Sequence, residues 1–164
     1  RQDIPVASMC AIEYYEDSLL PLARLYNLER ELDQALQEKI WLKSGGFLII
    51  QQTEAFVAID VNTGKHSSKK DAEENYKQIN REAALEIARQ LRLRNLSGMI
   101  LVDFINMKNT NDQSELLQYM GSLVRSDPMQ TVVVDVTALG IMEITRKKSA
   151  KTLAEQLLQL KKGE

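Results

Sequence analysis

Apolar residues recur at helical spacing in four parts of the chain. Between residues 21 and 39, leucines lie three or four positions apart with charged residues between them, which predicts an amphipathic helix. A long helix is expected from Asp71 to about Asn95, because Asp71 and Glu74 form a capping-box pattern and an apolar stripe of helical period follows. The two further helices that this spacing predicts cover residues 113–125 and 150–160.

Short apolar runs rich in β-branched residues predict strands. They cover residues 40–42, 47–50, 56–59, 99–102, 131–134 and 141–144. The order of these runs and the helices predicts an α/β fold with a mixed, partly parallel β-sheet flanked by helices. Its parallel strands are expected to be buried on both faces and joined by right-handed crossovers. Residues 1–18 show no period and are expected to be irregular.

Composition narrows the class of protein. With 164 residues, 44% hydrophobic and 27% charged, the chain is expected to fold as one domain or as one domain with a fragment of a second. Arg1 is not preceded by an initiator methionine, which suggests a segment of a longer protein. No apolar run approaches the roughly 18–20 residues of a membrane-spanning helix, so none is expected. One cysteine, Cys10, and one histidine, His66, exclude a Cys/His zinc cage and favour the cytoplasm.

Three predicted strands run directly into an aspartate, at Asp60, Asp103 and Asp135. Ligands of open α/β sheets bind outside the carboxyl ends of the strands, where these carboxylates would converge. Asn62 follows two residues after Asp60 and shares its face of the strand. Two carboxylates and an amide oxygen suit Mg²⁺, which keeps several waters. On spacing alone the alternative stays open that these aspartates cap helices or form turns, and Asp135 fits as well as Asp103.

Basic residues form two groups that could contact phosphates, although the net charge is only −2. The groups are Lys65, Lys69 and Lys70, and Arg146, Lys147 and Lys148. The alternative is an ordinary solvated surface. Trp41 is expected to pack in the core rather than to stack on a base, and His66 is expected in an exposed loop.

Three long blocks of sequence resemble, in order and spacing, the catalytic region of the bacterial ribonuclease E/G family. They are SGGFLIIQQTEAFVAIDVNTGK from Ser44, EENYKQINREAALEIARQLRLRNLSGMILVDFINM from Glu73, and TALGIMEITRKK from Thr137. The resemblance implies a deoxyribonuclease-I-like catalytic subdomain at residues 44–148. It also implies the end of a ribonuclease-H-like section at residues 1–43 and a helix or tail at 149–164.

The same resemblance implies an endoribonuclease that cuts single-stranded RNA with Mg²⁺, for which Mn²⁺ could substitute, and leaves 5′-phosphate and 3′-hydroxyl ends. Such enzymes act in RNA decay and ribosomal RNA processing and form homo-oligomers. In the family pattern, the metal ligands fall on Asp60 and Asp103, and the orienting asparagine falls on Asn62. Asp135 is not a ligand in that pattern, and the basic residues named above would hold RNA.

Several departures from the family pattern keep an alternative open. Asn106 stands where relatives carry a second acid, and Ala138 stands where a basic residue is common. No zinc-linking cysteines follow Lys148, so no zinc is expected in this chain, and no part resembles the family's OB-fold RNA-binding domain. The alternative function is a non-catalytic dimerisation or RNA-binding fragment. A deoxyribonuclease is compatible with the metal chemistry but has no support from the motifs.

Overall fold

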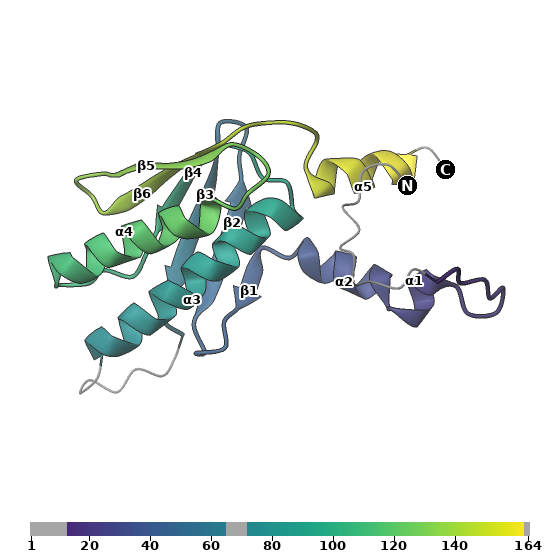
Figure 1. Ribbon diagram of the computed structural model, residues 1–164, viewed down its shortest axis with the longest axis horizontal. Coiled ribbons are helices and arrows are strands. Elements are labelled where there is room, and N and C mark those ends of the chain that lie inside the picture. The colour runs from purple at the N-terminus through teal and green to yellow at the C-terminus, as the bar shows by residue number, and fades with distance from the viewer. Residues whose placement is uncertain (1–12, 65–71, 163–164) are drawn as a thin grey trace. The chain divides into compact units, whose positions relative to one another are not determined.

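The computed structural model describes residues 13–64 and 72–162 and divides into two compact units, Arg1–Gln34 and Ala35–Glu164 (Figure 1). The first unit carries two short helices, α1 (Leu22–Leu25) and α2 (Leu28–Ala35). The expected single helix over residues 21–39 is therefore wrong. Asn27 interrupts it with a left-handed backbone, φ 51°, which asparagine tolerates better than most residues.

The second unit contains a six-stranded sheet in the order β1-β2-β3-β4-β6-β5. The strands are β1 (Lys39–Trp41), β2 (Phe47–Gln52), β3 (Phe56–Asn62), β4 (Gly98–Asp103), β5 (Thr131–Val136) and β6 (Ile141–Arg146). β3 and β4 pair in parallel, and the other neighbours pair antiparallel. The mixed, partly parallel sheet is confirmed. The expected domain limit at Ser44 would separate β1 from this sheet, whereas the two compact units meet at Gln34 and Ala35.

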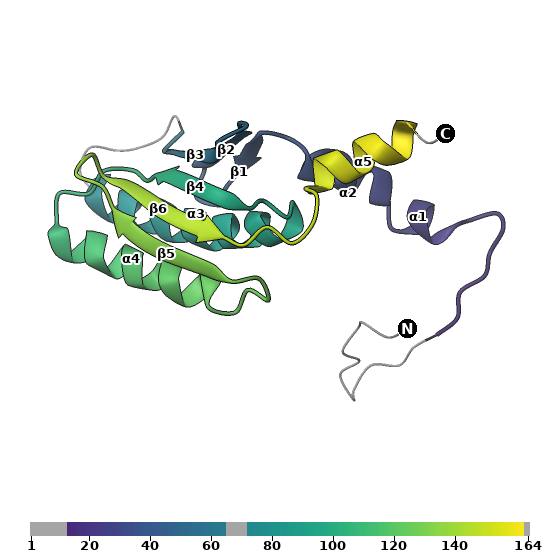
Figure 2. The ribbon, with the colours of Figure 1, turned by 90° about the horizontal axis from the view of Figure 1, so that it is seen from above.

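The helices α3 (Ala72–Leu93) and α4 (Thr110–Val124) lie side by side on one face of the sheet (Figure 2). α3 links β3 to β4, and α4 links β4 to β5, so the two crossovers step across the sheet in the same direction. Crossovers of one hand that step in one direction place their helices on the same face. Neither α3 nor α4 covers the opposite face of the sheet, which we call the open face.

Burial along the strands follows from this one-sided arrangement. Central strands alternate between fully buried and partly exposed residues, as in β3 and β6. The buried strand positions face the helices and include Leu48, Ile59, Ile100, Val102 and Ile144. The buried helix residues in the same core include Ile79, Ile87 and Leu91 of α3 and Met120 of α4. Each such side chain contributes about 1.5–3 kcal/mol by leaving water. The expectation that the strands are buried on both faces is therefore wrong, because apolar side chains such as Met99 and Val134 occupy the open face without being buried.

The last helix, α5 (Leu153–Lys162), is anchored to the end of α3. The Leu153 amide donates to the Arg94 carbonyl, and Asn95 donates to the carbonyls of Ala150 and Lys151. Thr152 and Glu155 form a reciprocal capping box, with the Thr152 amide 2.7 Å from the Glu155 carboxylate. The capping box explains why the helix begins three residues later than the expected residue 150.

Within the described residues, no helix is long and apolar enough to cross a membrane.

Candidate active site

Asp60 and Asp103 occupy the ends of the two parallel strands, β3 and β4. They are direct partners in the register of this strand pair, so their side chains leave the same face side by side. Both residues are exposed, and both line a cavity of about 340 Å³ at the carboxyl end of the sheet. The remaining lining comes from the end of β3, the loop after β4 and the β5–β6 turn. These residues are Val61, Asn62, Thr63, Phe104, Ile105, Asn106, Leu139 and Gly140.

Asn62 restrains the first of these carboxylates. Its side-chain amide nitrogen donates to Asp60 Oδ2 over 2.8 Å. The bond fixes the rotation of the carboxylate and leaves its other oxygen available to a ligand. The structure thus brings together the three residues Asp60, Asn62 and Asp103 that the sequence singled out.

A buried asparagine on α3 holds the loop that follows Asp103. Asn80 is fully buried, donates to the Ile105 carbonyl over 2.8 Å and accepts from the Ile105 amide over 3.0 Å. These bonds satisfy both backbone groups of a partly buried loop residue. Sequence reasoning missed Asn80, although a polar residue on the apolar stripe of a long helix is a signal that could have found it.

The Ser44–Gly46 turn supports the end of β3. A Cβ atom on Gly46 would lie 2.8 Å from the Asn62 carbonyl oxygen and 2.8 Å from Ile79 Cγ2. Two residues after the end of β3, a Cβ on Gly64, whose φ is +70°, would collide with the Gly45 carbonyl. Glycine is therefore needed at both contacts, since any side chain would push the turn away from the strand that carries Asp60 and Asn62.

The donor set fits a hard divalent cation with few protein ligands. Over the described ranges 13–64 and 72–162, no group of three or more Asp, Glu, His or Cys side chains could hold a metal. Mg²⁺ commonly uses one or two carboxylates and keeps several waters, so the Asp60–Asp103 pair with Asn62 suffices. The cavity beside the pair leaves room for those waters and for a ligand.

Asp135 does not join this pair. It lies on the edge strand β5, opposite Glu143 of β6, and its carboxylate accepts from the neighbouring Val136 amide. It lies outside the lining of the cavity that holds Asp60 and Asp103. The interpretation that treated all three strand-end aspartates alike therefore does not extend to Asp135.

The basic residues expected to hold RNA are only partly accounted for. Lys65, Lys69 and Lys70 lie outside the described residues, as do Cys10, His66 and Asp71. Arg146 is 4% exposed and forms an ion pair with Asp127 over 2.8 Å. The same guanidinium also donates to Asn95 and to the Leu96 carbonyl. Its expected role in RNA binding is corrected to a structural one.

Lys147 and Lys148 are exposed, but they follow the opposite end of β6 from the carboxylates. Ile141 at the start of β6 pairs with Asp103, whereas Arg146 at its end pairs with Gly98. At about 3.3 Å per residue, five residues of strand place these lysines roughly 17 Å along the sheet from Asp103. Any phosphate they contact is remote from the candidate site.

Trp41 contradicts the expectation of a core position, since its side chain is 65% exposed. It lies on β1, at one edge of the described sheet, opposite Phe47 of β2. The alternation of β1 directs this ring to the open face, while the buried strand positions face α3 and α4.

Comparisons with known proteins agree with the resemblance in the sequence. The profile of the Ribonuclease E/G family matches residues 3–149. The chain is 40% identical over 137 residues to ribonuclease G of Escherichia coli, a match that covers 84% of the chain and 28% of that protein. The corresponding match to ribonuclease E of Nostoc sp. is 38% over 144 residues, covering 88% and 21%. The match to ribonuclease G of Haemophilus influenzae is 40% over 137 residues, covering 84% and 28%.

The chain thus spans between 21% and 28% of the length of these relatives. Because the profile matches most of its residues, the chain belongs to the Ribonuclease E/G family.

Proposed function

We propose that this chain is the metal-binding catalytic segment of an endoribonuclease. Its substrate is single-stranded RNA, and hydrolysis of a phosphodiester bond leaves 5′-phosphate and 3′-hydroxyl ends. The observation that carries the proposal is the direct pairing of Asp60 with Asp103 at the ends of the two parallel strands. Membership of a family whose relatives are named ribonucleases supports RNA as the substrate.

In this proposal Asp60 and Asp103 would hold a divalent cation, Mg²⁺ or Mn²⁺. When bound, the cation supplies positive charge beside the phosphoryl oxygens and lowers the pKa of coordinated water. Asn62 keeps the Asp60 carboxylate in one orientation through its 2.8 Å hydrogen bond. Asn80 acts as a positioning residue by holding the backbone that follows Asp103.

Further parts of the proposal follow from the same family membership. The enzyme would act in the cytoplasm, in RNA decay and ribosomal RNA processing, and as a homo-oligomer. Lys65, Lys69 and Lys70 follow β3 directly in the chain and would supply phosphate contacts near the carboxylates. Lys147 and Lys148 would contact only more distant phosphates.

The test is cleavage of a labelled, 5′-monophosphorylated single-stranded RNA by an excess of the 164-residue chain in Mg²⁺. We expect cleavage that EDTA abolishes. Asp60→Asn and Asp103→Asn should each reduce the rate by about 100-fold or more, because the charge on the transition state loses its stabilisation. Asp135→Asn is the matched control, since it removes a strand-end aspartate outside the cavity and should cleave normally.

Two outcomes would contradict the proposal. Normal cleavage by Asp103→Asn would show that the carboxylate pair is not the reaction centre. RNA binding by the wild-type chain without cleavage in saturating Mg²⁺ would instead favour the non-catalytic RNA-binding fragment.

A further inference from the structure

Lys39, Trp41 and Phe47 form a compact cluster on the open face, which we call the aromatic platform. The ring centroids of Trp41 and Phe47 lie 5.3 Å apart at an interplanar angle of 60°. The Lys39 ammonium lies 4.2 Å from the Trp41 centroid and 3.9 Å from the Phe47 centroid. The distances are those of cation–π contacts, so the three side chains support one another.

The register of the sheet places the aromatic platform on the same face as the carboxylates. Trp41 pairs with Phe47, and Phe47 pairs with Asn62 on β3. In the next row, Lys39 pairs with Ile49, which pairs with Asp60. Neighbouring strands are about 4.8 Å apart, so the backbone of Phe47 lies about 5 Å from Asn62 and that of Lys39 about 10 Å from Asp60.

A cavity extends from the carboxylates toward the aromatic platform as far as Ile49, the strand partner of Lys39. Ile49 separates Lys39 from Asp60 in the cross-strand row, and it lines a second cavity of about 220 Å³. Asp60 and Asp103 line this cavity as well as the one at the strand ends. A strand of nucleic acid at the carboxylates can therefore extend across the open face toward β1.

Among the described residues of the second unit, packing leaves Trp41 of the aromatic platform open to a ligand. Trp41 is 65% exposed, although tryptophan buries more apolar area than any other residue when it packs. Among the described residues, Lys39 forms no ion pair with a carboxylate, so its charge is available to a phosphate. An exposed aromatic ring beside a cation is a suitable surface for stacking an unpaired base.

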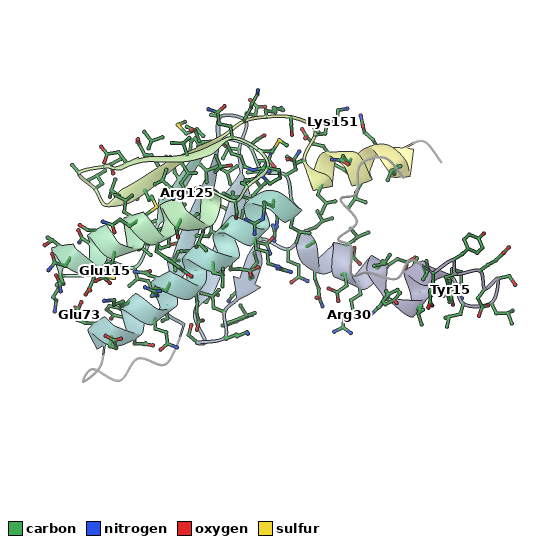
Figure 3. The ribbon with its side chains drawn as sticks, in the orientation of Figure 1. Tyr15, Arg30, Glu73, Glu115, Arg125 and Lys151 are labelled. Atoms are coloured by element: carbon green, nitrogen blue, oxygen red, sulfur yellow. The ribbon has the colours of Figure 1, made fainter. Side chains whose placement is uncertain are left out.

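Acidic side chains on α3 and α4, the helices on the other face of the sheet, favour the open face as the surface along which a polyanion binds. Glu73 on α3 and Glu115 on α4 lie at the same end of the helical layer (Figure 3). Both helices begin at this end, which is the end of the sheet where β3 and β4 carry Asp60 and Asp103. Lys77 pairs with Asp112 and Glu115, and Lys108 pairs with Glu73, so the lysines there are already partnered.

We propose that the aromatic platform binds single-stranded RNA, with a nucleobase stacked on Trp41, Phe47 packed against that ring, and a phosphate held by Lys39. The inference rests on RNA as the substrate class and adds a base-binding site beside the carboxylates. Stacking there directs the strand across Asp60 and Asp103 and positions a neighbouring phosphodiester over them. It is tolerant of sequence, since every base presents a π-face.

Trp41 is the only tryptophan of the chain, so intrinsic tryptophan fluorescence reports on this site alone. The probe is a short single-stranded oligoadenylate, titrated into the full 164-residue chain in EDTA, so that neither metal binding nor cleavage contributes. We expect saturable quenching of Trp41. The absence of quenching, with the oligonucleotide shown to bind by anisotropy, would overturn the proposal.

Variants of the aromatic platform separate stacking from charge. Trp41→Ala should weaken oligoadenylate binding, measured by anisotropy, by about tenfold, whereas Trp41→Phe should retain most of the affinity. Lys39→Gln should make the slope of log Kobs against log salt less negative by about 0.7, as for one lost phosphate contact on a single strand. Leu85→Ala is the matched control, because Leu85 is an exposed apolar residue of α3 and should change neither quantity.

The remaining outcomes distinguish this inference from the proposed function. Asp103→Asn should abolish cleavage and leave the quenching unchanged. Quenching without any cleavage by the wild-type chain would overturn the proposed function and leave the aromatic platform supported. An oligonucleotide affinity unchanged in Trp41→Ala, together with loss of self-association in sedimentation, would overturn the aromatic platform and assign the surface to a second copy of the chain.

Discussion

Individual side chains set the geometry of the candidate site through backbone contacts. Asp60 and Asp103 come from strand ends, and their alignment depends on the residues that hold the following backbone. Asn80 does so with two hydrogen bonds to Ile105, and Gly46 does so by leaving room for the Asn62 carbonyl. Asn62 instead bonds the Asp60 carboxylate directly. The aspartates were predictable because each ends an apolar run. Asn80 was not recognised, because its partner Ile105 lies 25 residues away in the chain.

Asn80→Ala should destabilise the fold by about 1–2 kcal/mol, because it leaves the partly buried amide and carbonyl of Ile105 without these partners. Urea unfolding at neutral pH measures this loss. Mn²⁺ affinity should also fall, since the loop after Asp103 is released. Asn75→Ala on the same helix is the control, because Asn75 makes neither of these bonds. Equal stability of the Asn80→Ala variant and the wild type would contradict the assigned role.

Gly46→Ala should shift the turn against β3, because the added methyl would overlap the Asn62 carbonyl and Ile79. Strain of this kind costs about 1–3 kcal/mol. Thermal unfolding measures the cost, and RNA cleavage measures its effect on Asn62. Gly121→Ala is the matched control, because nothing lies within 4 Å of a Cβ on Gly121. A Gly46→Ala variant that behaves like Gly121→Ala would show that the close contact is unimportant.

At the scale of elements, local patterns located the strands and the long helices, but pairing decided how they are covered. β5 runs in the same direction as β4, yet β6 inserts between them, and both helices fall on one face. From sequence alone, apolar runs such as 99–102 and 131–134 suggest strands buried on both faces, because their open-face residues are also apolar. The burial of Arg146 was equally hidden, since its partner Asp127 lies 19 residues earlier.

The Asp127–Arg146 pair joins the segment before β5 to the end of β6, and both side chains are 3% exposed. Asp127→Ala should cost about 3–5 kcal/mol, because it leaves the buried guanidinium without its counter-charge. The double variant Asp127→Ala/Arg146→Met should recover part of this loss. Urea unfolding of the three chains tests the pair, and a mild effect of Asp127→Ala alone would contradict it.

The same pair predicts a loss of stability in acid. Burial raises the pKa of Asp127, but hydrogen bonds from Arg146, Met129 and Thr131 outweigh burial and hold the pKa below its ordinary value. The folded state therefore gains stability above the unfolded pKa of about 3.9 and loses it as pH falls from there through the lower folded pKa. Unfolding free energies measured across this range should fall in the wild type, with a shallower slope in Asp127→Asn.

At the scale of the second unit, the two faces of the sheet have different tasks. One face packs on α3 and α4 and provides the core, and the other carries the carboxylates and the aromatic platform. The net charge of −2 does not show this division, because it sums the charges of both faces. Composition alone could not locate the charged groups of either face, and the exposure of Trp41 depended on how β1 pairs at the edge of the sheet.

The most direct test of the account is a Mn²⁺ titration of the 164-residue chain followed by electron paramagnetic resonance. The account predicts one Mn²⁺ site in the wild type, with affinity reduced more than about tenfold in Asp60→Asn and in Asp103→Asn. Asp135→Asn should bind as the wild type does. Undiminished Mn²⁺ affinity in Asp60→Asn and Asp103→Asn would contradict the central claim that these two carboxylates form the metal centre.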